Sequence, residues 1–283
     1  MTIKKVAIIG SGTMGHGIAQ LVTTNGCDAC LTDINSELLE KAKSKIVGSL
    51  DKFVQKEKIT KAVRDEAIAK LKLTTDLSEA VKDADLVIEA VSENLDLKKR
   101  IFKDLDKMTK PGAILASNTS QYSITEIGTV LADQSRIIGM HFFNPPVIMK
   151  LIEIVKGGKT SDKTLNEVLD FSKKIGKETV VCKDSQGFIT TRVLVALRLE
   201  CYRIYDEGIA TKEDIDKALK LAFGHPMGQF ELADFSGLDI EVPICESLAK
   251  AHGERFNPPK SLVDLVKSGR YGKKNGKGWY NYE

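Results

Sequence analysis

A histidine and a glutamate in two successive apolar segments are the residues best suited to proton transfer. His141 lies near the end of Ile137 to Phe143, and Glu153 lies within the alternating segment Lys150 to Val155. An unpaired buried carboxylate is costly, and His141 is the best available partner for Glu153. Because histidine titrates near neutral pH, we predict that His141 exchanges a proton with a substrate while Glu153 holds its other ring nitrogen.

Short polar side chains follow another apolar segment. Ala113 to Ala116 has the composition of a buried strand, and the next four residues, Ser117 to Ser120, all carry hydrogen-bonding groups. Capping of the helix expected over Ile124 to Leu131 would need only one of them, so capping alone is the weaker of two interpretations. In the other, Ser120 and Asn144 orient the oxygen of a bound substrate.

The first apolar segment of the chain ends in a glycine-rich turn. Val6 to Ile9 is followed by helical spacing of apolar residues, which indicates a strand, a turn and a helix. Glycines there permit the turn, the approach of a diphosphate and close helix packing, and the helix N-terminus favours phosphate. A turn without a ligand is the alternative. The predicted cofactor loop consists of Gly10, Ser11, Gly12, Thr13, Met14 and Gly15.

Acidic residues at the ends of two further predicted strands extend this dinucleotide pattern. Asp33 follows the strand expected over Asp28 to Thr32, at the distance where a carboxylate binds the adenosine ribose. Ile34 stands where an arginine would help to bind a 2′-phosphate, so NAD is favoured over NADP. Glu93 and Lys98 follow a later strand and are plausible neighbours of the cofactor, because ligands of open α/β sheets collect at strand ends.

The composition describes an ordinary globular chain. Its 283 residues suffice for one large domain or two moderate ones, with 42% hydrophobic and 29% charged residues. A net charge of +3 and 6% aromatic residues argue against nucleic acid as the main partner. We find neither an apolar segment of membrane-spanning length nor a signal-peptide pattern. We therefore expect no membrane partner and a cytoplasmic location.

The five cysteines are scattered and odd in number, which favours reduced thiols over disulfides. Cys27 and Cys30 form a CxxC pair, but no second pair completes a zinc site. We predict buried structural thiols and no metal.

Apolar spacing predicts two domains: an α/β domain over residues 1–184, with a Rossmann-type, mostly parallel sheet, and an all-helical C-terminal domain over 185–283. An appended helical domain often buries its apolar faces in a dimer, so we expect a homodimer.

The strand expected over Ala84 to Val91 contains an unexpected carboxylate, Glu89. Helices are expected at residues 35–73 (two helices), 97–108, 124–131, 162–176, 187–207, 211–222, 240–252 and 261–268.

Lysines in the predicted helical hairpin and in the C-terminal tail could bind anions. Ser49, Lys52 and Lys56 belong to the predicted helical hairpin, where a solvated face is one interpretation and contact with a polyanionic substrate arm is the other. The tail, residues 271–280, is too rich in glycine for a helix and too aromatic for disorder. We expect it to fold back onto the protein, where Lys274 could reach an anion.

Seven motifs of the chain resemble those of the 3-hydroxyacyl-CoA dehydrogenases, most nearly the short bacterial 3-hydroxybutyryl-CoA dehydrogenases. The resemblance covers essentially the whole chain, and HFFNP following SNTS is its most specific part. The motifs are GSGTMG (10–15), ENL (93–95), SNTS (117–120), HFFNP (141–145), LIEIV (151–155), GHPMG (224–228) and YGKKNGKGWY (271–280).

This resemblance implies NAD-dependent interconversion of a (3S)-3-hydroxyacyl-CoA, such as 3-hydroxybutyryl-CoA, and the corresponding 3-ketoacyl-CoA. It implies that His141 and Glu153 are the catalytic pair, and that Ser120 and Asn144 line the substrate and the nicotinamide. The residues that it implies for CoA are Ser49 and Lys56, and those for NAD are Glu93, Lys98 and Lys274.

One segment departs from the family. The family commonly has PGFIVNR, with an active-site asparagine, where residues 186–192 of this chain are QGFITTR. Thr191 replaces that asparagine with a shorter side chain that carries one hydroxyl. The acyl preference is therefore open, whereas the base is retained.

Two other functions fit parts of the pattern. A Rossmann dehydrogenase of a small free hydroxy acid or sugar would need the same cofactor loop and the same base. A protein that binds NAD without turnover is also compatible with the fold alone, but the presence of both His141 and Glu153 argues against it.

Overall fold

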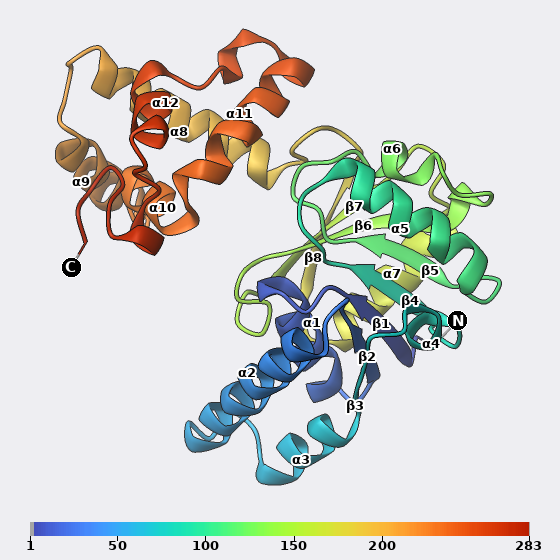
Figure 1. Cartoon of the computed structure of the whole chain (residues 1–283). Helices are drawn as coiled ribbons and strands as arrows, with labels where there is room; N and C mark the ends of the chain where they lie inside the picture. Colours follow the sequence, from blue (N-terminus) through green and yellow to red (C-terminus); the bar gives the residue numbers. More distant parts are fainter. Residues whose placement is uncertain (1–2, 283) are drawn as a thin grey trace. The chain divides into compact units, whose positions relative to one another are not determined.

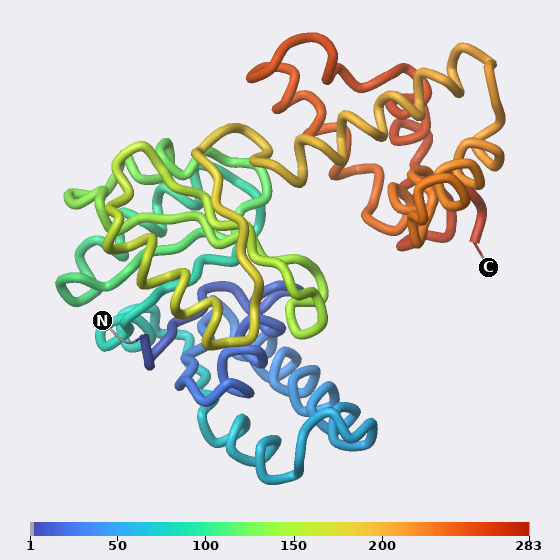
Figure 2. The backbone as a smooth tube through the Cα atoms, turned by 180° about the vertical axis from the view of Figure 1, so that it is seen from behind, coloured from blue at the N-terminus to red at the C-terminus, as the bar shows by residue number. Residues whose placement is uncertain are grey.

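The computed structural model describes residues 3 to 282, which divide into two compact units. The first unit ends at Ser185, and the second begins at Gln186. The first unit contains a sheet with helices on both faces, and the second contains helices (Figures 1 and 2). Among residues 3–282, no helix is long and apolar enough to cross a membrane.

The sheet of the first unit has eight strands in the order β3-β2-β1-β4-β5-β6-β7-β8. Neighbouring strands are parallel except for the antiparallel pair β6 and β7. The order reverses beside β1, and open sheets bind ligands at the carboxyl ends of the strands at such a point. The strands are β1 (Lys5–Ile9), β2 (Asp28–Thr32), β3 (Leu71–Thr74), β4 (Leu86–Glu89), β5 (Ile114–Ser117), β6 (Ile137–Phe142), β7 (Leu151–Lys156) and β8 (Glu178–Lys183).

Apolar faces of the helices cover this sheet. Ile18 and Val22 of α1, Ile46 of α2 and Phe171 of α7 are buried in one cluster with side chains of the sheet. The helices of this unit are α1 (Thr13–Thr24), α2 (Ser36–Gln55), α3 (Lys61–Ala69), α4 (Leu77–Val81), α5 (Leu95–Met108), α6 (Ile124–Gly128) and α7 (Asp162–Lys174), with a 3-10 helix at Gln134–Arg136.

Polar side chains fix where the helices next to the strand ends begin. The Asn94 side chain accepts a hydrogen bond from the Leu97 N–H at the start of α5. The Ser123 hydroxyl accepts one from the Glu126 N–H at the start of α6. Such caps satisfy backbone donors that have no partner inside the helix. They also determine where the loops that follow β4 and β5 end.

The second unit is helical, and its tail is folded onto it. The carboxylate of Asp234, which has no exposed surface, accepts hydrogen bonds from the N–H groups of Trp279 and Tyr280, both at 2.8 Å. The tail therefore folds back as expected. The helices are α8 (Thr190–Asp206), α9 (Lys212–Phe223), α10 (Gln229–Ser236), α11 (Leu238–His252) and α12 (Lys260–Lys267), with 3-10 helices at Glu254–Phe256 and Lys273–Asn275.

The predicted fold class is confirmed, but several boundaries were wrong. Leu71 to Leu73 was assigned to a helix and forms β3, because Leu71 and Leu73 pair with β2. The helix expected from Gly187 begins at Thr190, since Gly187 and Phe188 have φ angles of 74° and 50°. The helix expected to reach Leu131 ends at Gly128. Helix α10 was not predicted.

Asp85 lies directly before β4 and stabilises the amino ends of the central strands. Its carboxylate accepts hydrogen bonds from the N–H groups of Lys4 and Lys5 and from Lys110 Nζ, at 2.8, 3.0 and 2.7 Å. Burial by itself would raise the pKa of Asp85, but these hydrogen bonds outweigh it and hold the pKa below its ordinary value. A depressed folded-state pKa stabilises the protein above the unfolded-state pKa, and this contribution is lost as the pH falls through the folded-state pKa.

We predict that Asp85→Asn lowers the free energy of unfolding near neutral pH by about 1–3 kcal/mol, because buried donors lose a charged acceptor. The difference from the unsubstituted protein should shrink once the pH falls below the ordinary carboxyl pKa of about 4. Guanidinium chloride unfolding at a series of pH values measures both quantities. A difference that stays constant down to the lowest pH would contradict this account of Asp85.

Candidate active site

His141 and Glu153 face each other across two antiparallel strands. They are direct partners in the register of β6 and β7, and His141 Nδ1 lies 2.9 Å from Glu153 Oε2. Glu153 has no exposed surface, and His141 is 8% exposed. Side chains of directly opposed residues lie on the same side of a sheet. The register therefore brings together the two residues that the sequence singled out.

The contact with Glu153 determines the protonation pattern of the histidine ring. A carboxylate can only accept hydrogen bonds, so Nδ1 carries the proton in this contact, and Nε2 is the acceptor nitrogen of the neutral ring. The ring of Phe143 lies against the imidazole with 4.5 Å between the centroids. This arrangement orients a base, because the ring is held by a hydrogen bond at one nitrogen and by an aromatic contact.

Asn118 connects the polar residues after β5 to those after β6. Its side-chain oxygen accepts a hydrogen bond from the Phe142 N–H at 2.9 Å, and its own N–H donates to the Glu89 carbonyl. The loop that carries Ser120 is therefore attached to the end of β6, next to His141. Sequence analysis gave Asn118 no role of its own, although it lies inside the SNTS segment.

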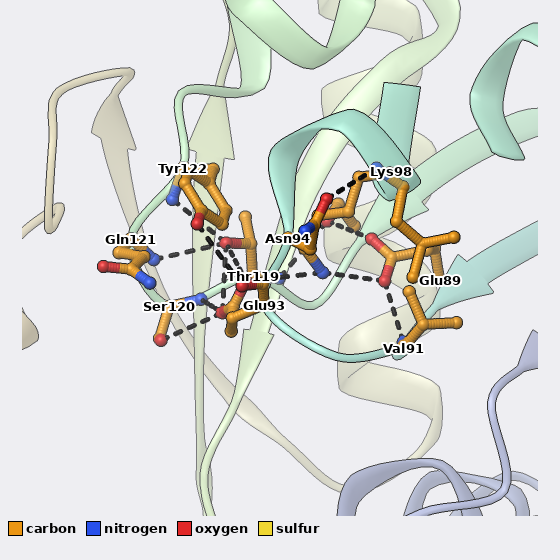
Figure 3. A network of polar contacts seen from close by, with 11 residues as sticks. Glu89, Val91, Glu93, Asn94, Lys98, Thr119, Ser120, Gln121 and Tyr122 are labelled. Carbon is orange, nitrogen blue, oxygen red and sulfur yellow. Dashed lines mark hydrogen bonds and ion pairs between the residues drawn. The ribbon is translucent and has the colours of Figure 1, made fainter. Parts of the chain in front are cut away.

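Glu93 is the centre of the hydrogen bonds around Ser120 (Figure 3). Its carboxylate accepts from the Ser120 N–H at 2.7 Å, from the Ser120 hydroxyl at 3.1 Å and from the Thr119 hydroxyl at 3.0 Å. The Tyr122 hydroxyl donates to the Glu93 carbonyl, and burial together with the charge of Glu93 raises the pKa of Tyr122. The SNTS segment thus makes several hydrogen bonds of its own instead of a single helix cap.

Lys98 lies behind Glu93. Its ammonium group is 2.8 Å from Glu89 and 3.4 Å from Glu93, and the residue is 1% exposed. The structure therefore brings Glu93, Lys98 and Ser120 into one network. A direct contact of Lys98 with a cofactor stays a prediction.

The three fingerprint glycines have different steric surroundings. A Cβ on Gly15 would lie 1.7 Å from the Gly10 carbonyl oxygen, and one on Gly10 would lie 2.7 Å from the Ala90 oxygen. A Cβ on Gly12 would have no atom within 4 Å. Gly10 and Gly15 are thus required by the fold, whereas Gly12 leaves space at the start of α1. That space fits a diphosphate against the helix N-terminus.

Asp33 is tied to the same loop. Its carboxylate accepts hydrogen bonds from both the N–H and the hydroxyl of Ser11, each at 2.7 Å. Ile34, directly after it, is 94% exposed. The carboxylate predicted to bind ribose therefore lies beside the predicted diphosphate loop.

Asn144 lies in an exposed loop that is attached at two points. A Cβ on Gly17 of α1 would lie 2.8 Å from Pro146, so this glycine permits the loop to approach the helix. The Lys177 ammonium group donates to the carbonyls of Pro146 and Met149, both at 2.6 Å, and burial lowers the pKa of Lys177. Sequence analysis missed both contacts, although a fourth glycine in GSGTMGHG was a visible signal for Gly17.

The other predicted residues lie outside this cluster. Lys56 is exposed and ends α2, and Ser49 lies two turns before it on the same face of the helix. Figures 1 and 2 show α2 and α3 as a hairpin that projects from the sheet. Thr191 and Lys274 belong to the second unit, where Lys274 forms an ion pair with Asp239.

The remaining histidines have contacts of a structural kind. His16 Nδ1 lies 2.6 Å from the Gly12 carbonyl oxygen, and His252 Nε2 lies 2.9 Å from that of Gln186. His225 has a longer contact, 3.5 Å, with Gln229. The cysteines are all free thiols, and no group of candidate metal ligands occurs within residues 3–282.

The strand order, the glycine loop and the histidine–glutamate pair define the class as a dinucleotide-binding oxidoreductase of the Rossmann type. Residues 5–185 match the family model described as 3-hydroxyacyl-CoA dehydrogenase, NAD binding domain, and residues 187–282 match the corresponding C-terminal domain. The chain belongs to the 3-hydroxyacyl-CoA dehydrogenase family. The predicted family and its NAD cofactor are confirmed.

Individual relatives match over almost the whole chain. The human mitochondrial hydroxyacyl-coenzyme A dehydrogenase is 43% identical over 99% of this chain and 92% of its own length. The 3-hydroxybutyryl-CoA dehydrogenase of Clostridioides difficile is 40% identical over 98% of this chain and 99% of its own. The crystal structure of (S)-3-hydroxybutyryl-CoA dehydrogenase from Ralstonia eutropha superposes with a TM-score of 0.96 at 38% identity and covers both chains completely.

The steric difference between two glycines gives a testable contrast. We predict that Gly12→Ala folds with nearly unchanged stability but binds NAD at least about tenfold more weakly, because its methyl group would occupy the diphosphate space. Gly15→Ala should instead lower the melting temperature strongly, because its methyl group would overlap the Gly10 carbonyl. Calorimetric NAD titration and thermal unfolding of both variants measure the contrast. Wild-type NAD affinity in Gly12→Ala would refute the proposed diphosphate position.

Proposed function

We propose that the protein interconverts a (3S)-3-hydroxyacyl-CoA and its 3-ketoacyl-CoA, with NAD as the hydride carrier and His141 as the acid/base. The observation that carries this proposal is the buried hydrogen bond between His141 and Glu153. It lies beside the end of β5, the strand that leads into the SNTS segment. Family membership supports the reaction type and the substrate class. The substrate considered first is 3-hydroxybutyryl-CoA, the substrate named for the bacterial relatives.

His141 acts on the hydroxyl proton. When the alcohol is oxidised, Nε2 of His141 takes the proton from the hydroxyl oxygen, a C=O bond forms, and the hydrogen on the adjacent carbon leaves with its electron pair. NAD held by the glycine loop would supply the acceptor for that hydride, and NADH its donor in the reverse direction. Positive charge then resides on the imidazole, where the Glu153 carboxylate stabilises it. Proton transfer of this kind contributes about 10²- to 10⁴-fold.

Other residues of the first unit hold the reactants. Asn144 would donate a hydrogen bond from its amide to the substrate oxygen and so favour the polarised carbonyl, and Ser120 would donate a second one after its hydroxyl turns away from Glu93. The glycine loop and α1 would hold the diphosphate, and Asp33 the ribose hydroxyls. Glu93 would act beside the nicotinamide. The roles predicted for Thr191 and Lys274 remain predictions.

The lysine face of α2 is proposed to bind the CoA arm. Ser49, Lys52 and Lys56 are spaced for one face of the helix, and two of them are cations. CoA carries several phosphate charges, and such charges are attracted to a lysine face in a manner that depends on ionic strength.

We also propose a homodimer formed through the helical unit. Large apolar side chains remain exposed there, and exposed apolar patches commonly mark interfaces. A monomer by sedimentation equilibrium at micromolar concentration would contradict this. The exposed side chains include Val193, Ile209, Leu221, Phe223 and Phe235.

A cytoplasmic location remains a prediction from the sequence.

The direct test is steady-state reduction of acetoacetyl-CoA, followed by the loss of reduced-cofactor absorbance with NADH and with NADPH. Free acetoacetate is the matched substrate without the CoA arm. We expect turnover with NADH and the thioester and far slower turnover with the free acid. Equal rates with both substrates would favour a dehydrogenase of small free acids, and NAD binding without turnover would favour a non-catalytic protein.

We predict that His141→Ala lowers kcat by about 10²- to 10⁴-fold while NAD affinity stays nearly unchanged, because the base is lost and the cofactor loop is not. Glu153→Gln should lower kcat less, since the ring stays but loses its charged partner. Both are measured by steady-state kinetics together with NAD titration. His225→Ala is the matched control, since this histidine lies in the second unit, outside the pair and the cofactor loop. Normal turnover of His141→Ala would show that the base lies elsewhere.

We predict that Lys56→Glu raises the KM for acetoacetyl-CoA several-fold and makes it less sensitive to salt, because an attractive charge becomes repulsive. Lys43→Glu is the control, since Lys43 is also exposed on α2 but its spacing places it on another face. KM values at low and high salt measure the effect. An equal KM for the two variants would return Lys56 to the solvated-face interpretation.

A further inference from the structure

The network around Ser120 extends to a second carboxylate that the proposed mechanism does not use. Glu89 is the last residue of β4 and has no exposed surface. Its neighbours in the sheet are Ile9, which precedes the glycine loop, and Ser117, which opens the SNTS segment. Glu89 therefore lies between two segments that the proposed site depends on.

Three donors converge on the Glu89 carboxylate. Oε1 accepts from the Val91 N–H and from Lys98 Nζ, both at 2.8 Å, and Oε2 accepts from the Ser117 hydroxyl at 2.6 Å. Glu89 and Lys98 are thus a fully buried ion pair, drawn at the right of Figure 3.

Lys98 shares its charge between two carboxylates of unequal exposure. It is 2.8 Å from Glu89 and 3.4 Å from Glu93, whose side chain is 33% exposed. Glu93 is at the same time 2.7 Å from the Ser120 N–H. Glu89 is the closer partner of Lys98 and compensates most of its charge. The attraction between Lys98 and Glu93 is therefore limited, and Glu93 remains hydrogen-bonded to Ser120.

A second route connects Glu89 to the same segment. The Ser117 hydroxyl donates to Glu89 and accepts from the Thr119 N–H at 3.3 Å, and the Thr119 hydroxyl donates to Glu93. A buried ion pair adds little net stability compared with apolar residues of the same size. The position that the ion pair gives to its neighbours explains it better than stability does.

We infer that Glu89 is a positioning residue: through Lys98 and Ser117 it sets the place of Glu93 and Ser120, and so of the substrate oxygen and the nicotinamide. This inference rests on the proposed function for the identity of the reaction. Glu89 itself has no exposed surface, so it acts through these neighbours. Loss of its charge leaves the Lys98 ammonium to draw Glu93 away from Ser120.

The test compares Glu89→Gln with Asp85→Asn, an acid-to-amide change just before the other end of β4. Both variants remove a buried charge that holds a lysine and backbone N–H groups, but only Glu89 borders Ser117. We expect Glu89→Gln to lower kcat for acetoacetyl-CoA reduction by about tenfold or more, the size of one lost charge-assisted hydrogen bond. Asp85→Asn should lower the melting temperature while kcat stays unchanged.

Cofactor binding gives a readout that general destabilisation would not move. ADP-ribose lacks the nicotinamide, so Glu89→Gln should weaken NADH binding several-fold and leave ADP-ribose binding unchanged. The ratio of the NADH affinity to the ADP-ribose affinity can be measured without turnover. If the unsubstituted protein fails to reduce acetoacetyl-CoA, the proposed function fails, whereas the ratio still decides whether Glu89 positions the nicotinamide end.

The double variant Glu89→Gln with Lys98→Met tests the route through Lys98. Removal of the uncompensated ammonium should recover part of the kcat that Glu89→Gln loses, so the two changes will not be additive. Ser117→Ala keeps the ion pair but removes the hydroxyl that donates to Glu89. It should change kcat and the ratio of NADH to ADP-ribose affinity in the same direction as Glu89→Gln, by a smaller factor, and it replaces Glu89→Gln if that variant does not fold.

The inference would be overturned if Glu89→Gln had the kcat and the affinity ratio of the unsubstituted protein. The same result in Ser117→Ala would overturn it if Glu89→Gln does not fold. An equal loss of kcat in Asp85→Asn would also overturn it.

Discussion

The burial of Glu153 is the constraint on which the arrangement of the site depends. A carboxylate with no exposed surface must have a partner, and the antiparallel register of β6 and β7 supplies one by placing His141 opposite. The reversal of direction at β7 is essential to this, since it places the middle of one strand beside the carboxyl end of another. The same contact sets the tautomer of the ring and thereby makes Nε2 the acceptor.

Steric limits at the loop between β1 and α1 are as strict as this electrostatic one. The loop between β1 and α1 folds back so closely that the Gly10 carbonyl occupies the place of a side chain at residue 15. The loop after Asn144 approaches α1 in a similar way at Gly17. Close backbone approaches of this kind hold the cofactor loop and the loop after β6 against one helix, whereas Asn118 holds the loop after β5 to the end of β6.

Prediction from the sequence succeeded where one signal was sufficient. The apolar runs and the glycine loop defined the α/β unit, and the needs of a buried Glu153 identified His141. The sequence failed at Leu71 to Thr74, because a short segment with weak alternation becomes a strand only when β2 offers an edge to pair with. It missed α10 because the buried face of this helix mixes the polar Gln229 and Asp234 with Phe230, so no apolar stripe marks it.

The amino-acid sequence by itself determined the family, the cofactor class and the residues that carry the proposed chemistry, because these follow from residue types at short, fixed spacings. Apart from the pairing of His141 with Glu153, only the tertiary structure decided which polar groups meet. Glu89 and Lys98 stood out as an odd carboxylate and a helix lysine, and only the pairing of β4 with β5 and the packing of α5 bring Ser117 and Lys98 to the same carboxylate. Contacts between residues far apart in the chain depend on strand order and register, which no local spacing encodes.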